Sequence, residues 1–436
     1  MLQNNTKPIY PLQYVTEETG VKADTLRAWE RRYDLPKPAR SAGGHRLYSE
    51  RDLKIIRWLL QRQQEGMRIS QAVRLWKSTI SAGDDPLLDD KSDLFSLSPN
   101  KLTLQTLKND WISACLEFDE ANAEKIVHEA FSLFLPESAL LEIFMPAICE
   151  IGALWYQGEA TVQQEHFASA LLVRRLNALI LSTPVPIRPE KIVVACPPEE
   201  EHTLYLLVIT FFLRRKGFNV VYLGANVPIE QLKETVQKIR PQLLILTAQQ
   251  LSTAATLSQT VNALHSTVPI AYGGSIFNTT PSIKRQINAY FLGNHIEKVF
   301  PTIEKILATR EHYPVHSLDN PLKELYEDFM LYRPAAHIYL TTQFASSGFP
   351  LMPMINANNF LSNNVAAALY FGDLDTLSPE LLWAENLLKN RQLDHIPLAG
   401  YLENYANAFL ATIGEKATPL AFWFDQKIDE IQERNR

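Results

Sequence analysis

One acidic segment holds a histidine that could coordinate a metal-bearing cofactor. The apolar run KIVVACP, residues 191–197, predicts a strand, and Glu200 and His202 follow it closely. A residue just past the carboxyl end of a parallel strand points into the crevice where α/β folds bind ligands. Glu200 would then fix one ring nitrogen of His202, as carboxylates do for metal-bound histidines. A surface histidine in an acidic loop is the alternative interpretation, so the pair alone does not establish a site.

Glycines beside later predicted strands would let a large group approach the backbone. Gly224 ends the run NVVYLG, and Gly273 and Gly274 end PIAYGG. Because glycine has no Cβ, its backbone can be approached more closely than that of any other residue. These positions therefore predict room for a planar or nucleotide-like ligand near the strand ends.

Nucleic-acid binding is indicated near the N-terminus, where arginines are spaced so that they share one face of a predicted helix. The segment ADTLRAWERR, residues 23–32, places Leu26 and Trp29 three residues apart, on one inward face. The residues predicted to face outward, toward a DNA groove and its phosphates, are Thr25, Arg27, Arg31 and Arg32. A preceding short helix over residues 11–18 and a turn at Thr19 and Gly20 predict a helix-turn-helix.

A basic hairpin is predicted directly after that helix. Gly43 and Gly44 permit a tight tip in the segment LPKPARSAGGHRLYSERDL. Four residues surround this tip and are predicted to form a wing that reaches the DNA backbone: Arg40, His45, Arg46 and Tyr48.

Composition and charge limit the function classes. The 436 residues are 46% hydrophobic and 21% charged, which excludes a disordered or collagenous chain and predicts two to four domains. The net charge of −6 divides into +7 for residues 1–80 and −13 for the rest, as expected if one end meets phosphate. Three isolated cysteines indicate a reducing compartment. No signal region and no apolar run of membrane-spanning length is evident, so we expect a cytoplasmic protein.

The chain divides into segments with different periodicity. Short β-rich runs alternate with helical stretches over residues 190–309, which predicts a Rossmann-like, doubly wound parallel sheet. The fold class is therefore multidomain α and α/β. The predicted order is a winged helix-turn-helix at 9–78, a linker at 79–103, a four-helix bundle at 104–186, the α/β domain at 190–309 and a C-terminal helical domain at 318–436.

Two stretches in the first segment resemble a known family. RAWERRY at residues 27–33, followed by P-x-R-x-x-GGHRLYS-x-x-DL from Pro38, resembles the DNA-binding domain of MerR-type transcription regulators. The resemblance covers about 70 residues. It implies a winged helix-turn-helix that is used in pairs on double-stranded promoter DNA.

The middle segments resemble cobalamin-binding domains. Glu200-x-His202, the turn at Gly224, Thr247 and the pair Gly273-Gly274 stand in the order of that family's motif. The resemblance implies that His202 is the lower cobalt ligand and that the cofactor's nucleotide tail lies beside the glycine pair. Upstream, the spacing Trp-x9-Glu-His is similar to the helical cap of light-sensing, adenosylcobalamin-dependent repressors of carotenoid genes, and it falls on Trp155, Glu165 and His166. There the tryptophan covers the adenosyl group.

The chain departs from that pattern at positions around the cofactor. Tyr205 stands where the family has a glycine beside the tail, and Gln249 replaces an aliphatic residue two positions after the strand-three hydroxyl. Tyr156 stands where light-sensing members often carry a histidine, and a phenol with a pKa of about 10 is a poor substitute as a cobalt ligand. These departures keep open a site for another ligand, or for none.

Three function classes follow. The first is a regulator whose homo-oligomeric assembly, as a dimer or tetramer, responds to adenosylcobalamin and light. The second is a cobalamin-dependent methyltransferase or mutase, which the absence of a substrate barrel disfavours. The third is a cofactor-independent regulator whose degenerate cobalamin fold serves only assembly. The C-terminal segment matches no family that we recognise; amphipathic patterns indicate a second sensory or oligomerisation module, and its histidines, His337 and His395, show no metal spacing.

Overall fold

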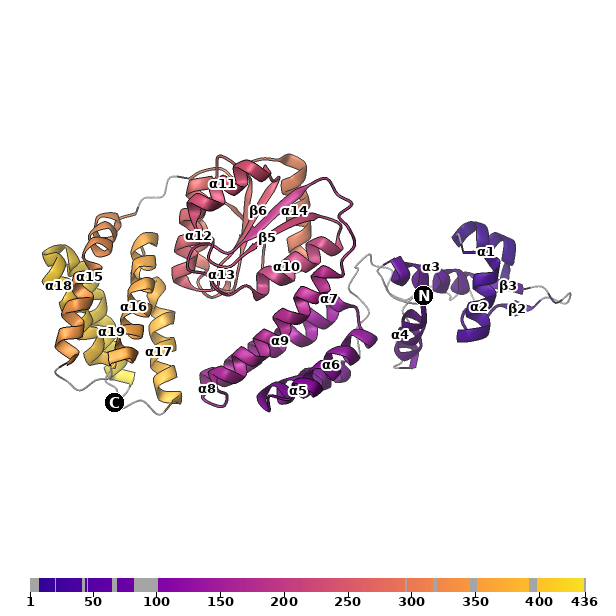
Figure 1. Cartoon of the computed structure of the whole chain (residues 1–436), viewed down its shortest axis with the longest axis horizontal. Helices are drawn as coiled ribbons and strands as arrows, with labels where there is room; N and C mark the ends of the chain where they lie inside the picture. The colour runs from indigo at the N-terminus through magenta and orange to yellow at the C-terminus, as the bar shows by residue number, and fades with distance from the viewer. Residues whose placement is uncertain are drawn as a thin grey trace. The chain divides into compact units, whose positions relative to one another are not determined.

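The computed structural model describes residues 8–19, 21–40, 44, 46–64, 69–81, 101–294, 296–316, 320–345, 351–391 and 398–434 (Figure 1). Within it the chain forms two compact units. The first comprises residues 1–155 and 160–168, and the second comprises 156–159 and 169–436.

The first unit begins with a small helical module on a three-stranded sheet. The strands run antiparallel in the order β1-β3-β2. In chain order the elements are β1 (Pro8–Pro11), α1 (Leu12–Thr19), α2 (Ala23–Tyr33), β2 (Ala39–Arg40), β3 (Arg46–Ser49), α3 (Glu50–Gln64) and α4 (Ile69–Ser81). The helix-turn-helix and its following hairpin are thus present as predicted.

Helix α2 forms because its apolar and polar residues separate onto two faces. Leu26 and Trp29 are buried in the core of the module, as predicted. Asp24 lies in the first turn and Arg31 and Arg32 in the last, where their charges complement the helix dipole. The exposed face therefore carries Arg27 in the middle of the helix and Arg31 and Arg32 at its end.

Longer helices complete the first unit. Trp111 packs edge-on against Phe144 at 5.4 Å between ring centroids, and Phe131 packs on the same ring at 5.8 Å. The elements are α5 (Lys101–Leu116), α6 (Glu120–Leu133), α7 (Pro136–Ala139), the π-helical turn η1 (Leu140–Phe144), α8 (Met145–Gln157) and α9 (Val162–Leu181). The last residues of α8 and most of α9 belong to the second unit.

The stretch Pro136–Gln157 is long and apolar enough to cross a membrane, by length and composition alone. It is the one such stretch among the described residues, and the core helix of a globular protein passes the same test.

The second unit contains a five-stranded parallel sheet in the order β5-β4-β6-β7-β8. Every residue of the central strand β6 is buried, as expected for a parallel strand with helices on both faces. Helices α11 and α12 cover one face and α10 and α14 the other (Figure 1). The elements are β4 (Lys191–Ala195), α10 (Leu204–Arg215), β5 (Asn219–Gly224), α11 (Ile229–Ile239), β6 (Leu243–Thr247), α12 (Leu251–Leu264), β7 (Ile270–Gly273), α13 (Ile276–Thr279), η2 (Pro281–Gln286), β8 (Tyr290–Phe291) and α14 (Ile296–Thr309).

The order in which strands are added to this parallel sheet reverses at β4. Strand β5 lies on one side of β4 and β6 on the other, so the loops that leave β4 and β6 diverge to opposite faces. Such a switch point opens a crevice at the carboxyl ends of the strands. The loop with Glu200 and His202 and the loop with Gln249 both lie there.

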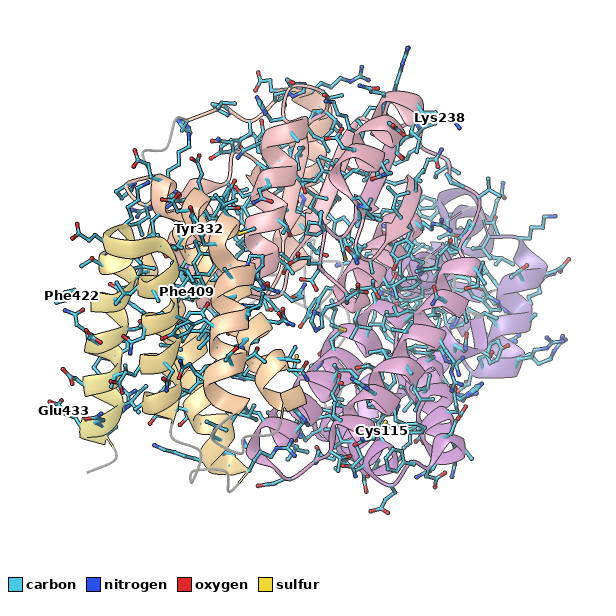
Figure 2. All side chains as sticks on the ribbon, turned by 60° about the vertical axis from the view of Figure 1, so that its left-hand side comes forward. Cys115, Lys238, Tyr332, Phe409, Phe422 and Glu433 are labelled. Atoms are coloured by element: carbon cyan, nitrogen blue, oxygen red, sulfur yellow. The ribbon has the colours of Figure 1, made fainter. Side chains whose placement is uncertain are left out.

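The C-terminal helices pack around an aromatic core. Phe329 stacks on Phe409 with ring centroids 4.4 Å apart, and Figure 2 shows Phe409 between helices while Phe422 points outward. The elements are α15 (Lys323–Ala345), α16 (Leu351–Phe371), η3 (Leu374–Leu377), α17 (Ser378–Asn390), α18 (Leu398–Ile413), η4 (Gly414–Ala417) and α19 (Thr418–Arg434).

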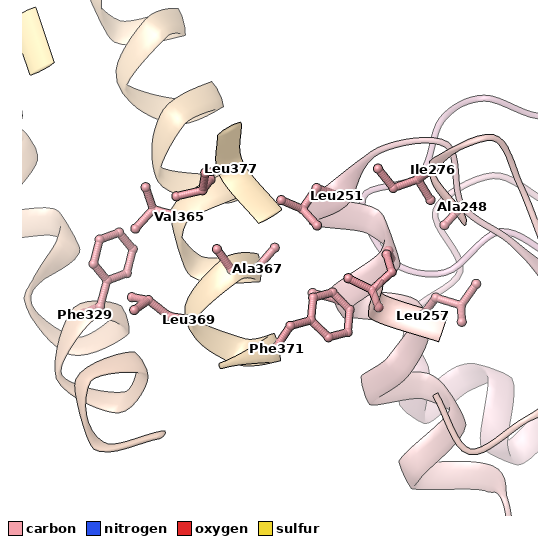
Figure 3. Close-up of a cluster of buried hydrophobic side chains, with 14 of the residues drawn as sticks. Ala248, Leu251, Leu257, Ile276, Phe329, Val365, Ala367, Leu369, Phe371 and Leu377 are labelled. Atoms are coloured by element: carbon pink, nitrogen blue, oxygen red, sulfur yellow. The ribbon is translucent and has the colours of Figure 1, made fainter. Parts of the chain in front are cut away.

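This helical domain shares one hydrophobic core with the α/β domain. Figure 3 shows Leu251 and Leu257 of α12 facing Ala367 and Phe371 of α16. Polar contacts line the same seam: the Tyr370 hydroxyl lies 3.2 Å from Ser258 Oγ and accepts a hydrogen bond from Asn262 Nδ2 at 3.1 Å. The predicted fold class is confirmed, with the C-terminal helices fused to the α/β domain through α12.

Candidate functional site

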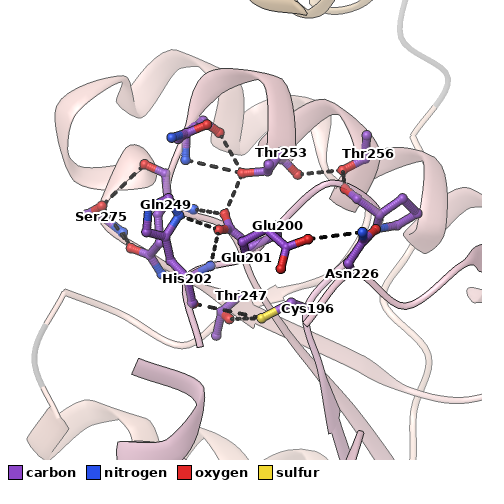
Figure 4. A network of polar contacts seen from close by, with 12 residues as sticks. Cys196, Glu200, Glu201, His202, Asn226, Thr247, Gln249, Thr253, Thr256 and Ser275 are labelled. Carbon is purple, nitrogen blue, oxygen red and sulfur yellow. Dashed lines mark hydrogen bonds and ion pairs between the residues drawn. The ribbon is translucent and has the colours of Figure 1, made fainter. Parts of the chain in front are cut away.

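Glu200 anchors the site at the carboxyl edge of the sheet. Its side chain is fully buried, and four donors satisfy its two oxygens (Figure 4). Oε1 accepts from the backbone N–H of His202 at 2.8 Å and lies 2.7 Å from His202 Nδ1; Oε2 accepts from the Gln249 N–H at 2.7 Å and from Thr253 Oγ1 at 2.6 Å. Burial alone would raise the pKa of Glu200, but the hydrogen bonds from His202, Thr253 and the two amides lower it. Glu200 is therefore an anionic link between the loops after β4 and β6.

The contact with Glu200 orients the imidazole of His202. Because Nδ1 faces the carboxylate, Nε2 is the ring nitrogen that would coordinate a metal. The His202 side chain is 56% exposed, so a bulky ligand can reach it. The predicted histidine and its orienting carboxylate are thus side by side.

Thr247 contributes to the floor of the site at the end of β6. It is buried, and its hydroxyl lies 3.6 Å from Cys196 Sγ, whose thiol pKa burial raises to about 12. Cys196 is therefore a neutral packing group, and Thr247 stands beside it rather than at the surface.

Gln249 has an unsatisfied amide group. Its Oε1 accepts from the backbone N–H of Ser275 at 3.0 Å and from Ser275 Oγ at 2.8 Å. Its Nε2 is buried and has no hydrogen-bond partner among the described residues. A buried donor without an acceptor costs about 1–3 kcal/mol, so this N–H group is available to a ligand.

The glycines of the site differ in their roles. A Cβ on Gly274 would lie 1.8 Å from the carbonyl oxygen of Ala248, and its φ of +134° lies in a region that other residues rarely adopt. A Cβ on Gly273 would meet nothing within 4 Å. Gly274 is therefore required by the fold itself, whereas the backbone of Gly273 is open to a ligand. Gly224, with φ +86°, lies next to the ring of Tyr222.

The upper-face residues of the prediction belong to the first unit. Trp155 and Glu165 are half-buried, and His166 is exposed with its Nε2 3.7 Å from Glu165 Oε2. Sequence places Tyr156 next to Trp155, but Tyr156 belongs to the second unit. Its ring stacks on Trp383 of α17 at 5.9 Å between ring centroids, and its hydroxyl donates to the Trp383 carbonyl at 3.3 Å.

The residues predicted to contact DNA differ in how far they are exposed. Arg27, Arg31, Arg32 and Arg40 are exposed, and Thr25 is half-buried. Arg27 pairs with Asp24 on the same helix at 2.9 Å. His45 lies outside the described residues.

Two of the predicted wing contacts need correction. Tyr48 is only 1% exposed and belongs to the hydrophobic core, where burial raises its pKa to about 12. It supports the core of the module rather than projecting from the wing. The Arg46 guanidinium is bound to Glu30 Oε2 at 2.6 Å with 24% of its side chain exposed, so it links β3 to α2 instead of projecting freely.

Other groups in the site escaped the sequence reasoning. Thr253 closes the Glu200 network and also caps α12 together with Gln250. A hydroxyl three residues into a predicted helix is a signal for such a cap. Nothing in the sequence indicated that Trp383 would hold Tyr156, because the two are 227 residues apart.

Family models match most of the described site. Residues 10–79 match the model described as MerR HTH family regulatory protein, and residues 107–180 and 190–295 each match one described as B12 binding domain. The chain is 30% identical over 260 residues to the HTH-type transcriptional repressor CarH of Myxococcus xanthus, covering 60% of this chain and 85% of that protein. The chain belongs to the MerR family of transcription regulators that carry cobalamin-binding domains. It is a DNA-binding regulator gated by cobalamin.

Further relatives of this MerR-type regulator extend the comparison. The HTH-type transcriptional repressor CarA of Myxococcus xanthus is 30% identical over 239 residues, covering 54% of this chain and 75% of that protein. Among solved structures, the monomethylamine corrinoid protein of Methanosarcina barkeri matches with a TM-score of 0.41 and 16% identity, covering 46% of this chain and 99% of that one. The curated relatives are named as transcription regulators.

The residues of the MerR-type regulator's second unit fit a corrinoid. His202 offers an oriented ring nitrogen, Gln249 an unsatisfied buried N–H, and Gly273 an open stretch of backbone. The first can act as a metal ligand and the second as a donor to an oxygen or nitrogen of the cofactor's tail. Tyr205, the residue that departs from the motif, is 41% exposed on the first turn of α10.

Proposed function

We propose that this chain is a light-responsive transcriptional repressor that uses adenosylcobalamin to control its assembly on promoter DNA. The observation that carries the proposal is the buried Glu200 that orients His202 at the switch point of the sheet. The names of CarH and CarA support the repressor role, and the three matched domains support the combination of DNA and cofactor binding. A cytoplasmic location agrees with this role.

The residues that match the family's cofactor motifs would hold the cofactor. His202 would be the cobalt ligand, with Glu200 fixing its ring, and Thr247, Gly273 and Gly274 would line the path of the tail. The cap would contribute Trp155, Glu165 and His166. When bound, adenosylcobalamin supplies a cobalt–carbon bond that light can break.

DNA contact is assigned to the first module. Arg27, Arg31, Arg32 and Arg40 are exposed cations that can neutralise phosphates, and Thr25 borders the same helix face. A pair of such modules in a homo-oligomer would bind far more tightly than one, because the second contact forms at high effective concentration. Control of assembly is therefore control of DNA affinity.

We also propose a role for each domain of the chain. Residues 9–78 bind DNA, 79–103 link, 104–186 cap the cofactor and 190–309 hold it. Residues 318–436 form a separate helical domain that is fused to the cofactor domain through α12.

A specific observation favours a second candidate, a regulator without the light response. Tyr156 replaces the family's histidine, and its ring and hydroxyl are both engaged by Trp383. Such a chain would bind cobalamin and signal through assembly without photochemistry at that position.

The deciding experiment is performed in the dark with the full chain. The protein is mixed with adenosylcobalamin and freed of excess cofactor by gel filtration, and its visible spectrum and elution volume are recorded before and after green light. We expect retained colour and a light-dependent change in size. Colour without a change in size supports the second candidate, and no retained colour contradicts both cobalamin roles.

A matched pair of variants locates the ligand. His202→Ala should abolish retained colour, whereas His265→Ala should not, because His265 lies at the far end of α12, away from the carboxyl edge of the sheet. Equal retention by both variants would show that His202 is not the cobalt ligand.

A further inference from the structure

The C-terminal helical domain contains a polar cluster in an otherwise apolar interior. Asn358 and Ser362 on α16 are 2% and 0% exposed, and Tyr405 on α18 is also fully buried. Buried polar groups persist in folded proteins when they are hydrogen-bonded or when they serve a ligand. The partners of each group in this cluster therefore show what it can still bind.

A line of hydrogen bonds connects Tyr405, Ser362 and His337. The Tyr405 hydroxyl lies 2.6 Å from Ser362 Oγ, and Ser362 Oγ lies 2.7 Å from His337 Nε2. Among the described residues the buried Tyr405 hydroxyl is hydrogen-bonded to Ser362 Oγ, and either hydroxyl can be the donor. With Tyr405 as the donor, Ser362 donates to His337 Nε2, and neutral His337 carries its own proton on Nδ1.

Asn358 is arranged in a similar way. The Tyr401 hydroxyl donates to Asn358 Oδ1 at 2.7 Å, which assigns the oxygen of the amide and leaves its NH2 group on the other side. No hydrogen bond to that Nδ2 is formed by the described residues. A nearly buried amide thus presents donors that no protein group uses.

His337 and Asn358 line the same pocket. Its volume is about 290 Å³, and it is lined by His337, Ile338, Thr341, Thr342, Ile355 and Asn358. Both threonine hydroxyls donate to carbonyls of their own helix, Thr341 to His337 O at 2.7 Å and Thr342 to Ile338 O at 2.9 Å. Among the described lining residues, the N–H groups of His337 and Asn358 are therefore the side-chain donors left for a ligand, beside apolar walls from two isoleucines.

The charge around the pocket favours an anion. Arg333 lies one turn before His337 on α15 and donates to Asn363 Oδ1 at 2.6 Å. Burial first, and then the positive charge of Arg333, lower the pKa of His337, so its ring stays neutral at pH 7. Among the described residues that line the pocket there is no carboxylate. A ligand group here meets donors and a nearby cation.

We propose that this pocket between α15 and α16 binds a small organic acid, whose carboxylate accepts hydrogen bonds from Asn358 Nδ2 and His337 Nδ1 and whose apolar part contacts Ile338 and Ile355. The volume lies at the lower end of the roughly 300–1,000 Å³ of small-molecule sites, which suits a short aliphatic or single-ring acid. This is a second ligand site, independent of cobalamin, in the domain that shares its core with the cofactor domain.

A charge-swap experiment on the full chain tests the proposal. Ile338 and Leu331 are both 69% exposed on α15, one heptad apart, but only Ile338 lines the pocket. Binding of butyrate, hexanoate, benzoate and phenylacetate is measured by saturation-transfer NMR titration. We expect at least one acid to bind saturably, about fivefold more weakly to Ile338→Glu and more tightly to Ile338→Lys, with no change in Leu331→Glu or Leu331→Lys.

A second variant tests the donor directly. Asn358→Asp keeps the oxygen that accepts from Tyr401 but replaces the NH2 group by a negatively charged oxygen, so acid binding should be lost while the thermal unfolding profile shows that the domain stays folded. Benzamide and hexanamide are the neutral counterparts of two of the acids. Absence of saturable binding by every acid up to roughly 10 mM, equal binding of amides and acids, or equal effects at positions 338 and 331 would each overturn the proposal.

Discussion

At the scale of single residues, the site depends on a carboxylate that has no spare acceptor capacity. Glu200 accepts four hydrogen bonds from three different segments, and each of its oxygens takes two of them. A group with this many partners sets the position of its neighbours more strictly than packing does. The role expected of Glu200 from its spacing to His202 is therefore only half of what it does, because it also ties the loop after β6 to the loop after β4.

Replacing Glu200 by glutamine should expose this double role. Each oxygen of Glu200 accepts from one pair of donors. A glutamine has only one oxygen, so one of these pairs would instead face the NH2 group of the glutamine, which is itself a donor. We expect Glu200→Gln to destabilise the second unit by about 1–3 kcal/mol and to weaken cobalamin retention, as measured by urea unfolding and by the visible spectrum.

Glu201→Gln provides the control for this prediction. Glu201 is exposed and accepts one hydrogen bond, from Asn226 Nδ2 at 3.0 Å, so its substitution should change stability by at most about 0.5 kcal/mol. If the two variants unfold at the same urea concentration, Glu200 is not the structural link that its hydrogen bonds indicate.

At the scale of elements, the DNA-binding module separates its cations into free and engaged groups. Arg31 and Arg32 extend from the last turn of α2 into solvent, whereas Arg46 on β3 is bound to Glu30 on α2. An ion pair with partly buried partners holds the strand against the helix and leaves less charge for phosphate. Arg31 is thus placed to meet phosphate, whereas Arg46 holds β3 against α2.

The salt dependence of DNA binding distinguishes an arginine that neutralises a phosphate from one that is held in an ion pair within the protein. If Arg31 neutralises one phosphate, Arg31→Ala should lower the slope of log affinity against log salt by about 0.9. Arg46→Ala should leave the slope unchanged and reduce the thermal stability of the module, because Glu30 loses its partner. Affinity is measured on specific and random duplexes at several salt concentrations.

Lys238→Ala serves as a remote control for these measurements, because Lys238 lies on α11 in the second unit (Figure 2). A slope change for Arg46→Ala equal to that for Arg31→Ala would mean that Arg46 leaves Glu30 when DNA binds.

At the scale of the whole molecule, the C-terminal helices are part of the second unit rather than an appendage. They share a core with α12, and α17 holds the segment that joins α8 to α9. Trp383 lies between Tyr156 at 5.9 Å and Phe360 at 5.6 Å, and Asn390 Nδ2 donates to the Tyr156 carbonyl at 3.0 Å. The residue after the cap tryptophan is therefore fixed by helices more than 200 positions later.

Removing the Trp383 ring should release this segment. In Trp383→Ala we expect amide hydrogen exchange over residues 156–159 to become faster by at least about tenfold, since the stacking on Tyr156 and the ring contact with Phe360 are lost. Leu382→Ala, at an exposed position on the same helix, should leave the exchange unchanged. Equal protection in both variants would show that the segment is held by other contacts.

Sequence alone determined the features that depend on local pattern. Apolar residues at spacing three placed Leu26 and Trp29 inside α2, β-rich runs between helices specified the parallel sheet, and Glu200-x-His202 after the first of these strands located the site. Each of these follows from residues that are close in the chain, where helix and strand periods fix which side chains share a face.

Only the tertiary structure decided the contacts between distant segments. It turned Tyr48 inward, bound Arg46 to Glu30, left Gln249 Nε2 without a partner and brought Trp383 to Tyr156. It also assembled His337 and Asn358 into a pocket, although His337 looked isolated in the sequence; His395 lies outside the described residues. The physical reason is that burial and pairing depend on which surfaces meet when the helices and the sheet pack. The local periodicity of a segment does not specify which distant segment it will contact.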